Sequence, residues 1–129
     1  MKSPRKLRPH QVVIRHKVGE DDDFNAIYED TYLKHVKFDD SVLLNQSTEG
    51  KESQKTAMII IDCSDLHARK NYIRCRYVSS SHYKPREGFF SIFVNDLVIY
   101  NCREYTVTKI DEVNPWGKRP QFIEVTCNG

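Results

Sequence analysis

Residues 89–126 contain two short extended runs, a tight turn, a polar loop and a closing strand, and the period-two alternation of apolar and polar side chains in these runs constrains the fold more than any other feature. Two short extended runs, residues 95–100 and 105–110, flank a tight turn at residues 101–104. Successive side chains of a strand point to opposite faces, so the pattern predicts a β-hairpin with one buried face. The turn contains no glycine, and we expect Asn101 to supply any left-handed residue there.

Further segments continue the extended pattern, and 55–62 is apolar on both faces, as a central strand is. Phe24, Ile27 and Tyr28 have the i, i+3, i+4 spacing of one short helix. Turns recur at the spacing typical of a small barrel or sandwich. We therefore predict an all-β fold, a small β-barrel of six or seven strands with long loops. Besides the hairpin, the expected strands are 11–18, 32–38, 55–62, 72–78 and 121–126.

The chain has 129 residues, which predicts one domain. Folding buries about two-thirds of its surface, enough for a core without disulfides or metals. We expect a basic N-terminal arm at 1–10 and a single barrel domain at 11–129. No apolar run approaches the roughly 18 residues that cross a bilayer, and no hydrophobic signal segment follows the basic N-terminus. We expect no membrane association and a protein made and used in a cytosol.

The net charge of +2 conceals a strong segregation of charge. Residues 1–19 carry six cations and no acid, whereas residues 20–30 carry six acids and no base. A basic arm can meet phosphates or an acidic protein surface, and the alternative is a solvated terminus. The cations are Lys2, Arg5, Lys6, Arg8, Arg15 and Lys17; the acids are Glu20, Asp21, Asp22, Asp23, Glu29 and Asp30.

Residues that could carry out catalysis or bind metal are few. The four cysteines form no C-x-x-C pair, their spacing fits no zinc template, and we expect small buried thiols. Pairing Cys63 or Cys75 with His67 would make a dyad, but no nucleophile motif accompanies it. Asp62 and Asp65 offer two carboxylates to a cation, or end a strand in a Ser-Asp turn. We expect no enzyme activity, metal or cofactor.

Exposed aromatic and basic residues suggest interaction surfaces. Tyr72, Arg74 and Arg76 share one strand face, which suits base stacking, phosphate binding, a protein interface or a solvated outer face. Trp116 lies beside Pro115 and Gly117, either as a lid over the barrel end or as an interface anchor.

Three polar segments, 45–54, 63–71 and 79–88, are expected to be exposed, mobile loops. Segment 79–88 carries Lys84, Arg86 and, when protonated, His82. Loops of this length gain order when neighbouring molecules supply contacts.

Four sequence segments within residues 55–127 carry a resemblance to a known family. The chain resembles the minor capsid proteins of tailed phages that infect Gram-positive bacteria, in particular the head-closure (head completion, stopper) proteins of the head-to-tail connector. It departs from them at the hairpin turn, where the family favours Asn-Gly and this chain has Asn101-Cys102. The segments are Ile60-Ile61-Asp62-Cys63-Ser64, Asn95-Asp96-Leu97-Val98-Ile99-Tyr100, Arg103-Glu104-Tyr105-Thr106-Val107 and Phe122-Ile123-Glu124-Val125.

The resemblance implies a structural virion protein of the neck, assembled in the bacterial host cytoplasm. Such barrels form a ring, twelve-fold by resemblance, with the portal and adaptor above, a tail completion protein below and packaged DNA in the channel. A ring of identical subunits needs two different patches that meet. The candidate interface residues are Lys2, Arg5, Lys6, Arg8, Asp21, Asp22, Asp23 and Trp116, and the candidate channel or DNA contacts are His82, Lys84, Arg86, Arg74 and Arg76.

The alternative is an OB- or SH3-like barrel that binds single-stranded nucleic acid in the cytosol. It would use Tyr72, Arg74, Arg76 and Lys84, and its binding would weaken with salt.

Overall fold

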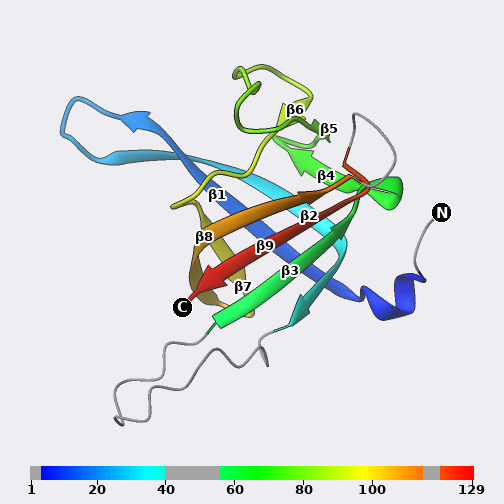
Figure 1. Cartoon of the computed structure of the whole chain (residues 1–129). Helices are drawn as coiled ribbons and strands as arrows, with labels where there is room; N and C mark the ends of the chain where they lie inside the picture. Colours follow the sequence, from blue (N-terminus) through cyan, green and yellow to red (C-terminus); the bar gives the residue numbers. More distant parts are fainter. Residues whose placement is uncertain (1–3, 40–55, 115–119) are drawn as a thin grey trace, which may run out of the picture.

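Nine β-strands and two single-turn 3₁₀ helices make up the regular structure of the described residues. The computed structural model describes residues 4–39, 56–114 and 120–129 (Figure 1). The 3₁₀ helices are η1 (Arg5–Leu7) and η2 (Cys63–Asp65). The strands are β1 (His10–Glu20), β2 (Ala26–Asp39), β3 (Thr56–Asp62), β4 (His67–Lys70), β5 (Ile73–Tyr77), β6 (Phe89–Phe90), β7 (Leu97–Tyr100), β8 (Arg103–Val113) and β9 (Phe122–Asn128).

Six of these strands close into an antiparallel barrel in the order β1-β7-β8-β9-β3-β2, because β1 pairs with both β7 and β2. The prediction of an all-β barrel is therefore confirmed. The other three strands continue outward from β2 through β4 and β5 to the parallel pair of β5 with β6 (Figure 1). The barrel itself has six strands, as expected, and the three further strands extend it. The prediction that 63–71 is a loop was wrong, because η2 and β4 occupy it.

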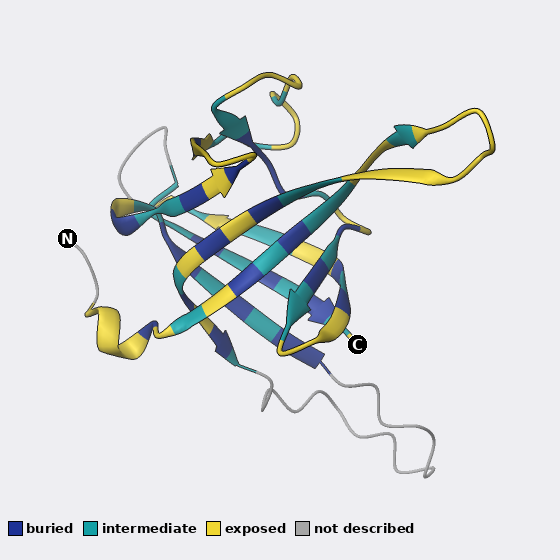
Figure 2. Ribbon diagram, turned by 180° about the vertical axis from the view of Figure 1, so that it is seen from behind, coloured by how far each residue is buried: buried dark blue, intermediate teal, exposed yellow. Residues whose placement is uncertain are grey.

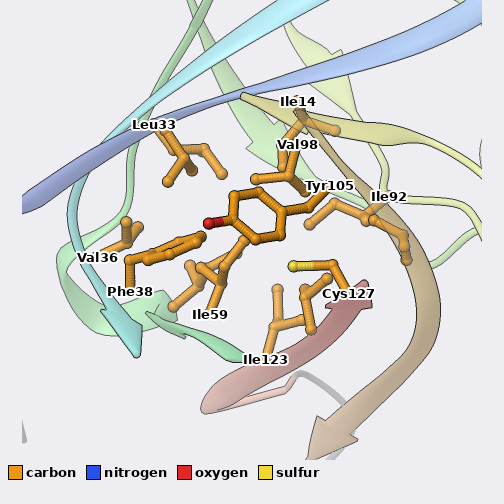
Figure 3. Packing of buried hydrophobic residues seen from close by; sticks show 14 of the residues in the cluster. Ile14, Leu33, Val36, Phe38, Ile59, Ile92, Val98, Tyr105, Ile123 and Cys127 are labelled. Atoms are coloured by element: carbon orange, nitrogen blue, oxygen red, sulfur yellow. The ribbon is translucent and has the colours of Figure 1, made fainter. Parts of the chain in front are cut away.

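Buried apolar residues of the strands form the core of the barrel. Figure 2 shows buried residues alternating with more exposed ones along several of these strands. On β9, Ile123, Val125 and Cys127 point inward and are buried, as the alternation predicts. Figure 3 shows Tyr105 reaching into the centre of this core beside Phe38. The centroids of the Phe38 and Tyr105 rings lie 5.2 Å apart, and the rings meet edge-on, which is a favoured aromatic geometry.

A bulge in β2 changes which residues face inward. Strict alternation over 32–38 predicts Leu33 and Val36 on opposite faces, yet both are buried. The register with β1 shifts between the pairs His10↔Val36 and Val12↔Leu33, and His35 has a φ of 57°. One extra residue on β2 therefore reverses the inward face, which is the usual effect of a β-bulge.

A hairpin replaces the short helix expected at residues 24–28, so that prediction was wrong. Ala26 already pairs with Glu20 in the β1–β2 ladder. The Asp21 carboxylate accepts the backbone N–H groups of Asp23 and Asn25, both at 2.9 Å, and this side-chain cap stabilises a turn in place of a helix. The paired strands project beyond the barrel as a ribbon (Figures 1 and 2).

The β7–β8 hairpin turn consists of Asn101 and Cys102, between the paired residues Tyr100 and Arg103. Both central residues have positive φ, 49° and 62°. Two-residue turns of this hand match the twist of the strands they join. The expectation for Asn101 is confirmed, and Cys102 is left-handed as well.

Candidate functional site

The N-terminal segment is fastened to the barrel mainly through the Asp65 carboxylate, and the Asp62 carboxylate lies 4.0 Å from Arg8. Arg5 donates two hydrogen bonds to Asp65, at 2.8 and 2.9 Å, and Arg8 donates a third at 3.0 Å. Arg8 is only 3% exposed and also donates to the His35 carbonyl at 2.7 Å. The Arg5 hydrogen bond, followed by that of Arg8, holds the pKa of Asp65 well below its usual range.

This anchor limits what the basic arm can contact. Arg8 is buried within the protomer and offers no surface to a partner, and Arg5 is bound to an internal carboxylate. Lys6 is exposed, and Lys2 lies outside the described residues. The sequence pattern did not reveal the ion pair of Arg8 with Asp65, because the two residues lie 57 positions apart in the chain.

Asp62 ends β3 as a turn former. Its carboxylate accepts the backbone N–H of Ser64 at 3.0 Å and the Ser64 hydroxyl at 2.6 Å. Asp65 is occupied by arginine. Within the described residues, no group of three or more His, Cys, Asp or Glu side chains could hold a metal ion.

The acidic residues proposed for an interface lie together at the end of the β1–β2 ribbon. Asp21, Asp22 and Asp23 are all exposed there. Glu20 pairs with Lys17 at 2.9 Å. Phe24, which the sequence analysis assigned to a helix, is 83% exposed at the turn. The ribbon therefore presents carboxylates and an aromatic ring together.

All five candidate channel or DNA contacts lie on one basic lobe, defined as β4, β5, β6 and the connecting residues 79–88. Residues 67–90 carry six Lys or Arg residues and one acid, Glu87. Tyr72 is 98% exposed at the β4–β5 turn. The exposed cations of the lobe are Arg69, Arg74, Arg76, Lys84 and Arg86, with His82 exposed beside them.

Lys70 is the buried cation of the basic lobe and ties it to the ribbon. Its ammonium donates to the Phe89 carbonyl at 2.7 Å and the Tyr83 hydroxyl at 3.3 Å, and pairs with Glu29. Burial opposes the charge, but the hydrogen bonds to Glu29 and Tyr83 prevail and raise the pKa of Lys70. Segment 79–88 is exposed over most of its length, as expected, but is anchored at Tyr83.

The thiols lack the features of activated nucleophiles. Burial raises the pKa of Cys63 and of Cys127 to about 11, and also raises the pKa of Cys75. The His67 Nε2 atom of the suggested dyad lies 3.3 Å from the Asp65 carboxylate and 3.1 Å from Arg5. Cys102 is exposed at the hairpin turn, so the expectation of buried thiols fails there.

Comparisons with protein families, curated proteins and solved structures find no match to this chain. Among the described residues, no helix combines the length and apolarity needed to traverse a bilayer. Trp116 and segment 45–54 lie outside the described residues. The acidic β1–β2 ribbon and the basic lobe are therefore the features of the described residues that bear on function.

Proposed function

We propose that this chain is a head-closure subunit of a phage neck, which forms a ring between the portal–adaptor complex and the tail and helps retain packaged DNA. The observation that carries the proposal is the separation of charge on the barrel. Acids gather on the projecting ribbon, and cations gather on the basic lobe. Two unlike, complementary patches on one chain support the head-to-tail contacts that a ring of identical subunits requires.

The channel contact is assigned to segment 79–88, which carries His82, Lys84 and Arg86 and is held at its middle by Tyr83. Arg86 lies 4.0 Å over the Phe89 ring, so its guanidinium is positioned at the surface of the lobe. Cations on an anchored segment suit contact with DNA phosphates without sequence readout.

The test is genetic and biochemical. Deleting the gene from the phage genome that encodes it should give DNA-filled heads without tails, whose DNA becomes accessible to nuclease. Complementation with the Lys84→Glu, Arg86→Glu double variant should restore the ring but only part of the DNA retention. Tailed, nuclease-resistant particles from the deletion genome would refute the proposed function.

A second candidate is a barrel that binds single-stranded nucleic acid. It is favoured by the exposed Tyr72 ring on the same lobe as Arg74 and Arg76. It predicts that the isolated chain binds a labelled oligonucleotide. The affinity should fall steeply between about 50 and 200 mM salt, because each phosphate contact releases counterions bound to the nucleic acid. Fluorescence anisotropy of wild type against Tyr72→Ala separates this candidate from the first.

A further inference from the structure

The ribbon tip, defined as residues 20–25, is a pre-organised turn that presents an aromatic ring to solvent. The Asp21 N–H donates to the Asn25 carbonyl at 2.9 Å, and the Phe24 N–H donates to the Asp21 carbonyl at 3.0 Å. Phe24 has a φ of 62° and is 83% exposed. A bulky residue in the left-handed region is a genuine outlier, and such strain clusters at functional positions.

A hollow of about 840 Å³ lies where the ribbon meets the basic lobe. Its wall includes the aromatic rings of Tyr28, Tyr32 and Tyr72 and the cations Lys34 and Arg69. Tyr72 repeats the features of Phe24, since it is 98% exposed on a tight turn and has a φ of 66°. This size is within the usual range of binding cavities.

The charges of the hollow are unevenly compensated. Its two acids are occupied, since Glu29 pairs with Lys70 and Asp30 pairs with Arg15 at 2.9 Å. Lys34 and Arg69 are exposed and make no ion pair with another described residue. The hollow therefore combines an aromatic wall with uncompensated positive charge.

We propose that this hollow receives the ribbon tip of a second copy of the chain. The Phe24 ring would lie among Tyr28, Tyr32 and Tyr72, and Asp22 and Asp23 would face Lys34 and Arg69. None of the tip residues of the same chain lines the hollow, and the extended ribbon carries Phe24 roughly 10 Å away from the lining residue Ile27. The proposal rests on the proposed function in that both require contact between copies.

A second copy explains more of the surface than a nucleic acid does. A nucleic acid would account for Tyr72 and Arg69, but it would be repelled by Asp22 and Asp23 and would leave Phe24 unused. Tip and hollow are different patches, so the contact repeats from copy to copy and builds a ring or a chain. Buried aromatic rings anchor such contacts, and the surrounding charges steer them.

The first test separates association from folding. Phe24→Asn and Tyr72→Asn each remove an aromatic ring and suit the left-handed backbone, so each variant should fold at least as stably as wild type. Each should nonetheless weaken self-association about tenfold or more, measured by sedimentation velocity up to millimolar concentrations. Arg103→Asp, an exposed charge reversal that does not line the hollow, is the matched control and should leave association unchanged.

The second test exchanges the charges. Asp22→Lys with Asp23→Lys, and separately Lys34→Asp with Arg69→Asp, should each weaken association, and combining all four reversals in one chain should restore it. In a Cys102→Ser background, Phe24→Cys mixed with Tyr72→Cys should cross-link through a short bis-maleimide.

A wild type that stays monomeric throughout, or one that associates equally well with either pair of reversals, overturns this interface. Oligonucleotide binding lost in the Lys34, Arg69 variant of such a monomer would assign the hollow to nucleic acid instead. Rings that form regardless of the reversals, with DNA retention still dependent on the protein, would reject the interface and leave the proposed function standing. Association through tip and hollow, together with tailed, nuclease-resistant particles from the deletion genome, would confirm the interface and refute the proposed function.

Discussion

Arg8 and Asp65 form an ion pair at 3.0 Å in which the two side chains are only 3% and 2% exposed. The pair joins the segment before β1 to the turn after β3, so it fixes the N-terminal residues on the closed barrel. Arg8 also lies 4.0 Å from the Asp62 carboxylate, so Asp65 supplies its closer counter-charge. Removing one member of a buried pair leaves the other charge poorly compensated, which is far more costly than removing both.

Asp65→Ala should therefore lower the free energy of unfolding by about 3–5 kcal/mol, measured by urea denaturation. Arg5→Ala is the matched control: the Arg5 side chain is half exposed, at 53%, and the loss of stability should be much smaller. The Arg8→Met, Asp65→Leu double variant should cost less than Asp65→Ala alone. Equal stability of Asp65→Ala and wild type would show that the pair contributes nothing.

The lowered pKa values of His35 and Asp65 should cause two separate losses of stability on acidification. Burial, reinforced by Arg5, lowers the pKa of His35, so the unfolded chain takes up a proton near pH 6.5 before the folded chain does. Stability should fall as pH drops below about 6.5 and level off once the folded pKa has been passed. Asp65, whose folded pKa is depressed, contributes stability above about pH 4 that is lost below it.

His35→Asn should remove the first loss and keep the second, because asparagine tolerates the left-handed backbone and does not titrate. The measurement is the free energy of unfolding at a series of pH values from 7 to 3. An unchanged slope between pH 7 and 5 in the variant would assign that loss to other groups.

Neighbouring isoleucines on β3 provide a test of the barrel interior. Ile59 is fully buried in the core (Figure 3), and Ile60 is only partly buried on the opposite face. Ile59→Ala should cost about 2–5 kcal/mol because it leaves a cavity, whereas Ile60→Ala should cost less than half as much. Similar losses at both positions would contradict the direction in which β3 faces.

The β7–β8 turn should be improved by glycine. Cys102 holds a φ of 62°, which glycine adopts without strain. Cys102→Gly should raise the free energy of unfolding by about 1 kcal/mol. Asn101→Gly, the control at the neighbouring left-handed residue, should change it little because asparagine already suits that position.

The four thiols should react at very different rates with a disulfide reagent at neutral pH. Cys102 is exposed and should react first. Cys63 is partly exposed but has a raised pKa and should react more slowly, whereas the buried Cys75 and Cys127, whose pKa values are also raised, should react only as the protein opens. The Cys102→Ser variant should lose the fast phase. A fast phase that persists in this variant would indicate an activated thiolate and support a cysteine enzyme.

The class of fold can be predicted from the order of the residues alone, because burial of one strand face leaves a period-two pattern in neighbouring residues. The spacing of Ile123, Val125 and Cys127 is enough to assign them to one face. In β5 only Cys75 of the expected inward residues is fully buried, and Ile73 is exposed. Prediction from this pattern fails where the backbone departs from regular geometry. The bulge at His35 reverses the alternation in β2, and the Asp21 turn replaces a helix with a hairpin.

Which charges are free to meet a partner depends on the three-dimensional arrangement of the chain. Arg5 and Lys6 are neighbours in a basic run, yet one is bound to Asp65 and the other is exposed. Likewise Lys70 is buried against Glu29, while Arg69 beside it is left in the open hollow. A charge pair forms between atoms that folding brings within about 4 Å, and the separation of two residues along the chain does not indicate whether they will pair.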